Sequence, residues 1–119
     1  MNFSSNAVAM TPEILKRKLG AEYLVPVTIA SSEFAYTDVI KAGTPINADG
    51  EVAEDTEYGG VTTSDAVGIL LNDVYVENPN GSLIKAFAVV NTANCPVDIS
   101  EHSVITDYVK AALPLIIFE

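Results

Sequence analysis

The stretch Ala66-Val67-Gly68-Ile69-Leu70-Leu71-Asn72-Asp73-Val74-Tyr75-Val76 decides the fold of this chain. Its aliphatic and β-branched side chains favour a strand. The dipeptide Asn80-Gly81 follows it and is typical of tight hairpin turns. A second apolar run is then formed by Leu83-Ile84-Lys85-Ala86-Phe87-Ala88-Val89-Val90. We therefore predict that residues 66–76 and 83–90 pair as a hairpin in the core of a sheet.

The chain before this hairpin predicts further extended segments. Tyr23–Ile29 favours a strand, which Pro26 restricts to a sheet edge or a bulge. Two shorter pieces, Val39–Lys41 and Thr44–Ile46, are separated by Gly43. Two connections follow: a turn at Ala48-Asp49-Gly50, and an acidic loop over Glu51–Thr63 with Gly59-Gly60 near its end.

The chain after the hairpin predicts one helix and one strand. Apolar side chains recur at helical spacing at Val104, Ile105, Tyr108, Val109 and Ala112. This spacing predicts a short amphipathic helix over Glu101–Leu113, which Pro114 ends. The apolar run Leu115–Phe118 predicts a buried terminal strand.

The N-terminal twenty residues predict an arm that carries a short helix. Residues 1–10 are small, polar and aperiodic, which indicates an extended segment. Thr11 can cap a helix, Pro12 suits its first turn and Gly20 suits its end. Such a helix, Pro12–Leu19, presents a narrow apolar stripe of Ile14, Leu15 and Leu19. Two turns are marginal alone in water, so we expect this helix to form against another surface.

Composition predicts one domain and an oligomer. The 119 residues are 49% hydrophobic and 18% charged, which is enough for one core, with an apolar surplus that subunit interfaces usually absorb. The sequence therefore predicts a single β-dominated α+β domain over residues 21–119, preceded by the arm of residues 1–20.

The charge distribution limits the possible partners. The net charge of −10 divides into +2 on residues 1–20, from Lys16-Arg17-Lys18 less Glu13, and −12 on residues 21–119. An acidic body repels phosphate backbones, so we expect no nucleic-acid partner. The longest apolar run, Leu113–Phe118, is far short of a membrane span, and Met1–Ser5 does not begin a signal peptide. The single cysteine fits a protein made in a reducing cytoplasm.

The residue types predict no catalytic, cofactor or metal site. His102 is the only histidine, and Cys95, which precedes Pro96, is better explained as a small buried hydrophobe than as a nucleophile. The segment Asn47–Glu51 faintly resembles a calcium loop, but Pro45 stands where that loop would need an acid, so a plain turn is favoured. The acidic loop is most simply solvated, with weak surface cation binding left open. We expect a protein that is not an enzyme.

The middle of the chain resembles the head decoration and head-fibre proteins of tailed phages. The resemblance rests on an ordered pattern: Ile40-Lys41-Ala42-Gly43-Thr44-Pro45-Ile46, the turn Asp49-Gly50, a variable acidic loop, and the run from Ala66 to Val74. It covers about residues 38–92. It implies a β-tulip-like domain in a structural virion protein that is made in the host cytoplasm and decorates the capsid exterior.

The resemblance also implies a homotrimer at the three-fold positions of the shell, with the N-terminal segment on the major capsid protein. The expected capsid-binding residues are Ile14, Leu15, Lys16, Arg17, Lys18 and Leu19. The expected subunit-interface residues are Thr44, Pro45, Ile46 and Gly68.

Three alternatives stay open at this point. The short helix could pack on its own domain, with loops such as Gly43–Ile46 gripping the capsid. Pro45 and Gly68 could simply shape the monomer. A virion-surface module for glycans or receptors is the alternative function, although Tyr36, Tyr58 and Tyr75 are scattered along the chain.

Overall fold

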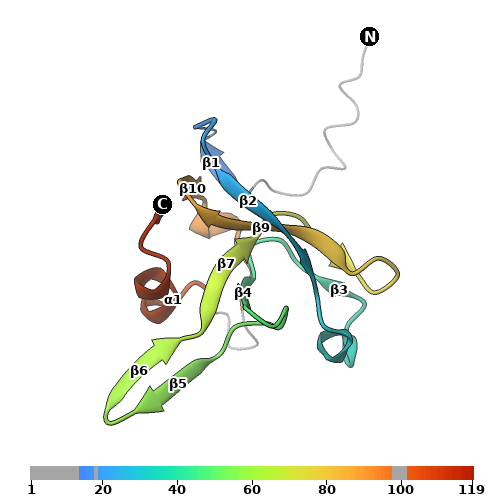
Figure 1. The fold of residues 1–119 in the computed structure, drawn as a ribbon, viewed down its shortest axis with the longest axis horizontal. Coiled ribbons are helices and arrows are strands. Elements are labelled where there is room, and N and C mark those ends of the chain that lie inside the picture. The colour runs from blue at the N-terminus through green and yellow to red at the C-terminus, as the bar shows by residue number, and fades with distance from the viewer. Residues whose placement is uncertain (1–13, 18, 98–101) are drawn as a thin grey trace.

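The computed structural model describes residues 14–17, 19–97 and 102–119. It is β-dominated, as the sequence predicts (Figure 1). The strands are β1 (Leu15–Arg17), β2 (Tyr23–Thr28), β3 (Val39–Ile40), β4 (Pro45–Asn47), β5 (Asp55–Tyr58), β6 (Val61–Ser64), β7 (Ala66–Leu70), β8 (Val74–Tyr75), β9 (Asn80–Ala86), β10 (Ala88–Val90) and β11 (Ile116–Phe118). The helices are the 3-10 turns η2 (Ser31–Phe34) and η3 (Thr92–Asn94) and the α-helix α1 (Asp107–Ala112).

The predicted central pairing is present. Strands β7 and β9 are antiparallel neighbours in a sheet of order β2-β9-β7-β4, with Ile69 opposite Ile84 and Leu70 opposite Leu83. The predicted Asn80-Gly81 turn is wrong, because both residues lie in β9 and pair with β2. The chain reverses earlier instead, where Asn78 N–H donates to Tyr75 O.

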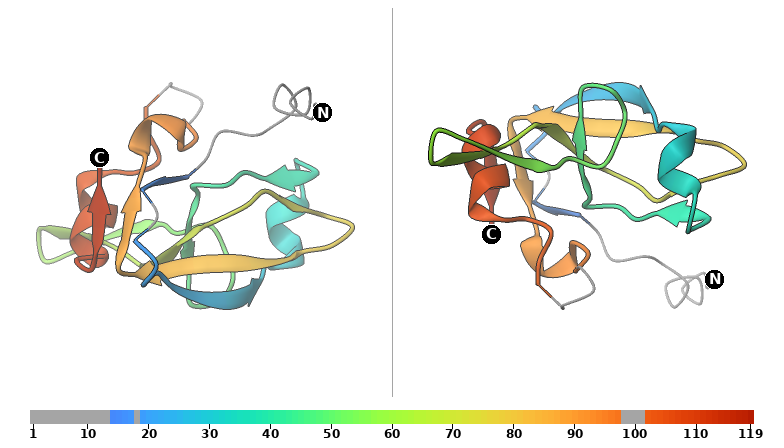
Figure 2. Two further views of the ribbon diagram at one scale, coloured as in Figure 1. Left: turned by 90° about the horizontal axis from the view of Figure 1, so that it is seen from above. Right: turned by 90° about the horizontal axis from the view of Figure 1, so that it is seen from below.

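The apolar run of residues 83–90 is divided between two sheets. Phe87, at φ 61°, interrupts it, and β10 beyond Phe87 joins a second sheet of order β1-β10-β11. The predicted terminal strand is present as β11, which runs parallel to β10. It is only partly buried, since Ile116 faces the core and Ile117 is 55% exposed. In the left view of Figure 2, β10 and β11 run crosswise to β2 and β9, near one end of these strands.

The N-terminal helix prediction is wrong in the described residues, because Leu15–Arg17 form strand β1. This strand pairs antiparallel with β10, with Leu15 opposite Val90, and Asn91 N–H donates to Ile14 O. A two-turn segment has little helical stability of its own, so pairing with a buried strand decides its conformation. Pro12, Glu13 and Lys18 lie outside the described residues.

The acidic loop prediction is also corrected, because β5 and β6 form a hairpin within it. Gly59 and Gly60 have φ of 62° and 83°. Positive φ at both central residues is the requirement of a type I′ turn, whose twist matches that of paired strands. Thus Gly59-Gly60 is a hairpin turn. The hairpin projects from the body beside α1 (Figures 1 and 2).

The C-terminal helix is shorter than predicted. Thr106 Oγ1 accepts a hydrogen bond from Val109 N–H and caps the first turn, so the helix begins at Asp107. Ile105 lies before that cap yet is buried, as are Val109 and Leu113. The helical spacing of the apolar residues therefore continues beyond the helix itself. Glu101 lies outside the described residues.

Two apolar clusters form the core. The larger one joins β1, β7, β10, β11 and α1, and includes Ile14, Ile69, Ile84, Val90 and Val109. The smaller one lies under β2, β4 and β8, and includes Ile46, Leu70 and Val74. Strand β9 contributes to both, with Ile84 to the first and Leu83 to the second.

Candidate interaction surfaces

The expected capsid-binding residues divide into buried and exposed groups. Ile14 is 3% exposed and belongs to the larger core cluster, against which Leu15 also packs. Lys16, Arg17 and Leu19 are exposed, and Lys18 lies outside the described residues. The side chains of Ile14 and Leu15 are thus engaged within their own domain, as the first alternative anticipated. The expectation that they contact the capsid stays a prediction, and in the protomer these two side chains are already packed.

The expected subunit-interface residues are buried inside the protomer. Ile46 has no exposed surface, and Thr44, Pro45 and Gly68 are buried as well. Thr44 Oγ1 donates to Lys41 O at 2.7 Å. A Cβ at Gly68 would lie 2.8 Å from Ile84 O, so glycine permits the close approach of β7 and β9. Their burial favours the alternative in which Pro45 and Gly68 shape the monomer, and the interface expectation stays a prediction.

The outer face of the β1-β10-β11 sheet carries an apolar patch. Ala88, Val90 and Ile116 face the core, so the residues alternating with them point outward. Phe87 N–H donates to Leu115 O at 2.8 Å, and Ile117 lies opposite Val89, which is only 3% exposed and is therefore covered on this face. The exposed members are Phe87 (53%), Leu115 (58%) and Ile117 (55%), which we call the terminal-sheet patch.

Phe87 has an unusual backbone conformation for its residue type. It is the one non-glycine residue with positive φ in the described ranges, at 61°. A bulky side chain in this region costs about 1–2 kcal/mol relative to the right-handed conformation, and glycine would avoid the cost. The ring is also half exposed, so burial in the protomer recovers only part of that cost. Strained residues of this kind often occur at functional surfaces.

A second apolar surface lies at the end of the β5–β6 hairpin. Tyr58 and Val61 flank the Gly59-Gly60 turn and are directly opposite each other across the ladder. Tyr58 is 89% exposed and Val61 is 63% exposed. Opposite residues share one face of a hairpin. We call this pair the hairpin tip.

The two surfaces differ in their electrostatic surroundings. Next to the terminal-sheet patch, Arg17 is paired opposite Val89, and its guanidinium lies 3.0 Å from Glu119 Oε1. Lys16 Nζ lies 4.0 Å from the same oxygen. These two cations share one carboxylate. Residues 51–65, which contain the hairpin, include five acids and no Lys or Arg: Glu51, Glu54, Asp55, Glu57 and Asp65.

The base of the hairpin is held by hydrogen bonds to Asn47 and Asp65. Asn47 Oδ1 accepts from the N–H groups of Asp49 and Glu51, which makes a plain turn of the segment that resembles a calcium loop. Asn47 Nδ2 donates to Asp65 Oδ2 at 3.1 Å, and Glu54 N–H donates to Asp65 Oδ1 at 2.8 Å. Within the described ranges, no group of three or more potential metal ligands gathers. Asp65 therefore acts as an anchor for the hairpin.

The two residues considered for chemistry differ in exposure. His102 is exposed, whereas Cys95 is buried and its Sγ lies 3.5 Å from Asn91 O. A surface depression of about 180 Å³ lies between β4 and the start of α1. Its lining is mainly aliphatic, with Pro45, Val52, Val104 and Val109, and Asp55 is the single ionisable residue in it. This lining offers no acid–base pair.

Burial raises the pKa of the Cys95 thiol from 9.0 to about 11. We expect the folded protein to react with a thiol reagent at pH 8 at least about 100-fold more slowly than the urea-unfolded protein, because two pKa units lower the thiolate fraction by that factor. The unfolded chain releases this proton first as the pH rises, so stability should fall between pH 9 and 11. Stopped-flow measurement of the thiol reaction rate in the folded and the unfolded protein checks the first of these two expectations. Equal rates in the two states would contradict it.

The sequence interpretation did not identify Phe87, Leu115 or Ile117 as surface residues. The signal was the unbroken apolar run of residues 115–118, which makes both faces of a strand apolar. One face then reaches the core and the other remains exposed when no second layer covers it. Tyr58 and Val61 could have been found from the Gly59-Gly60 turn between them.

Among the described residues, no helix is long and apolar enough to cross a membrane. Comparison of the chain with protein-family models, curated proteins and solved structures finds no match.

Proposed function

We propose that this chain is a structural virion protein, not an enzyme, that binds the outer surface of a phage capsid as a homotrimer and stabilises or decorates the head. The resemblance over residues 38–92 supports this function, and the proposal includes a β-tulip-like description of the domain. The structural observation that carries it is the terminal-sheet patch, three exposed apolar side chains on a strained sheet surface. Contiguous exposed apolar residues are typical of interaction sites.

The proposed capsid contact moves towards the N-terminus relative to the sequence expectation. Ile14 is buried in the larger core cluster and Leu15 packs against it. We therefore assign the capsid contact to residues 1–13 together with Lys16, Arg17, Lys18 and Leu19. Basic side chains would add a salt-sensitive attraction where the major capsid protein is acidic.

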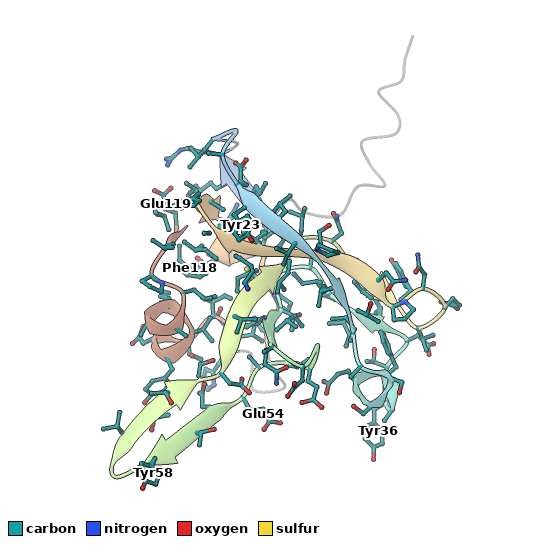
Figure 3. All side chains as sticks on the ribbon, in the orientation of Figure 1. Tyr23, Tyr36, Glu54, Tyr58, Phe118 and Glu119 are labelled. Atoms are coloured by element: carbon teal, nitrogen blue, oxygen red, sulfur yellow. The ribbon has the colours of Figure 1, made fainter. Side chains whose placement is uncertain are left out.

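The alternative module for glycans or receptors gains no support from the tyrosines. Tyr36 and Tyr58 lie at different ends of the molecule in Figure 3. Tyr75 belongs to β8, which pairs with β3. These rings are separate and do not line one groove.

The proposal is tested with purified heads that lack the protein. We expect a trimer in sedimentation at micromolar concentration, and saturable co-sedimentation with heads. Deleting residues 1–13 should leave the trimer intact and weaken head binding by about 100-fold or more, because three linked contacts are lost together.

This truncation is preferable to removing residues 1–20, which would also remove β1 and expose the core. A lysozyme of similar size serves as the negative control for head binding. Absence of binding at micromolar concentration would contradict the proposed function. Full binding by the truncated protein would contradict only the assignment to its N-terminal segment.

A further inference from the structure

The hairpin tip and the terminal-sheet patch are separate on one protomer. Tyr58 labels the end of the hairpin in Figure 3, and Phe118 and Glu119 label the terminal sheet at the other end, with α1 between them. Helix α1 packs against β6. The two surfaces therefore cannot meet within one chain without unpacking that contact.

The exposed face of the hairpin lacks a partner within the described residues. Cross-strand pairing puts Tyr58 and Val61 on one face with Thr56 and Thr63, and all four side chains are exposed. Thr62 and Ser64, on the opposite face, are half buried. The hairpin therefore packs one face against the domain, where α1 contacts β6, and leaves the other face open. The aromatic and β-branched residues of the exposed face are the types that pack well on a flat apolar surface.

The two surfaces match each other in apolar character and in charge. Each has an apolar centre, Tyr58 with Val61 on the hairpin and Phe87 with Leu115 and Ile117 on the sheet. The hairpin region carries a charge of −5 over residues 51–65, whereas beside the patch Lys16 and Arg17 carry +2 against the −1 of the Glu119 side chain. In a chain of net charge −10, an acidic surface of one copy is repelled by most of the next copy. The surface at Lys16 and Arg17 is the exception.

We infer that the β5–β6 hairpin of one copy docks on the terminal-sheet patch of a second copy, with Tyr58 and Val61 against Phe87, Leu115 and Ile117. The contact joins two different surfaces, so it is heterologous and repeats head to tail until a ring closes. The ring of three rests on the proposed function, which supplies the trimer. The strained Phe87 then has a role as an anchor, since aromatic side chains carry much of the energy at interface centres.

The first test uses single substitutions at two matched exposed tyrosines. Tyr58→Ser should raise the trimer dissociation constant by about tenfold or more, because it removes an aromatic anchor. Tyr36→Ser is the control, because Tyr36 is fully exposed and lies away from both the hairpin tip and the terminal sheet in Figure 3. This substitution should leave association unchanged. Sedimentation across a dilution series measures both, with circular dichroism confirming the fold. An unchanged trimer in Tyr58→Ser overturns the contact.

The second test distinguishes head-to-tail from symmetric docking. Single variants Tyr58→Cys and Ile117→Cys are produced with tags of different size, co-refolded in a mixture and treated with a short bis-maleimide. The contact predicts cross-linking between the two variants and none within either variant alone. The native chain, whose Cys95 is buried, is the control for background cross-linking. Cross-linking of Tyr58→Cys to itself would indicate a symmetric contact and overturn the inference.

The outcomes separate this inference from the proposed function. A stable trimer without cross-links between the two variants overturns the hairpin contact and leaves the proposed function standing. A trimer that gives the cross-link but does not bind heads supports the contact and overturns the proposed function. A chain that is monomeric at all concentrations overturns both. Loss of head binding in Tyr58→Ser with an intact trimer would assign the hairpin to the shell and overturn docking between copies.

Discussion

Replacing Gly50 with alanine is expected to lower the free energy of unfolding by about 2–5 kcal/mol, the sum of backbone strain and a steric clash. Gly50 has a φ of 80°, and a Cβ there would collide with the backbone oxygen of Thr28. The carbonyl of Gly50 also accepts a hydrogen bond from Ala30 N–H at 2.8 Å. Relieving the collision would separate the turn from the end of β2.

Gly60→Ala is the matched control for this effect. Gly60 has a similar φ of 83°, but a Cβ there would meet no atom within 4 Å. We expect it to cost only the backbone strain, about 1–2 kcal/mol. Urea unfolding followed by circular dichroism, at one protein concentration, measures both variants, because oligomerisation makes apparent stability concentration-dependent. Equal losses at the two glycines would mean that the contact with Thr28 does not constrain the fold.

Leu70→Ala is expected to cost about 2–5 kcal/mol, through lost apolar burial and the cavity left behind. Leu70 has no exposed surface, lies opposite Leu83 and belongs to the smaller core cluster with Ile46 and Val74. Its backbone N–H also donates to Thr44 O at 3.0 Å, so the strand position is fixed and cannot easily collapse into the space.

Leu19→Ala is the control, because Leu19 is half exposed and lies outside both core clusters. It should change the unfolding free energy by less than about 0.5 kcal/mol. The two variants are compared by urea unfolding under the same conditions as the glycine pair. A similar loss for both leucines would show that the smaller cluster contributes little to stability.

The local sequence determined several elements by itself. The runs around Ile69 and Ile84 predict two paired strands, because both faces of a central strand are apolar and no helix period competes. The turn at Asp49-Gly50 could be predicted because Gly50 tolerates positive φ. The end of the C-terminal helix could be predicted because Pro114 cannot continue it. The β-dominated class could be predicted from these features, since each depends on neighbours within a few residues.

Tertiary structure decided the rest, for an identifiable reason in each case. Leu15–Arg17 carry helix signals but become a strand, because pairing with β10 buries Ile14 and outweighs the weak preference of two helical turns. Asn80-Gly81 continues a strand because both residues pair with β2, Asn80 opposite Thr28 and Gly81 opposite Val27. Such contacts join residues distant in sequence, which local patterns do not encode.

The candidate surfaces divide in the same way. The apolar surplus and the separation of charge are properties of the composition, and they predict an oligomer without locating its contacts. The residues expected at a subunit interface, Thr44, Pro45, Ile46 and Gly68, are buried in the protomer, while Phe87, Leu115 and Ile117 remain exposed. Which face of an apolar strand is covered depends on the layer packed against it. The sequence thus determined that apolar surface would remain, and only the tertiary structure decided where, because β10 is buried on both faces whereas β11 packs Ile116 on the core and leaves Ile117 exposed.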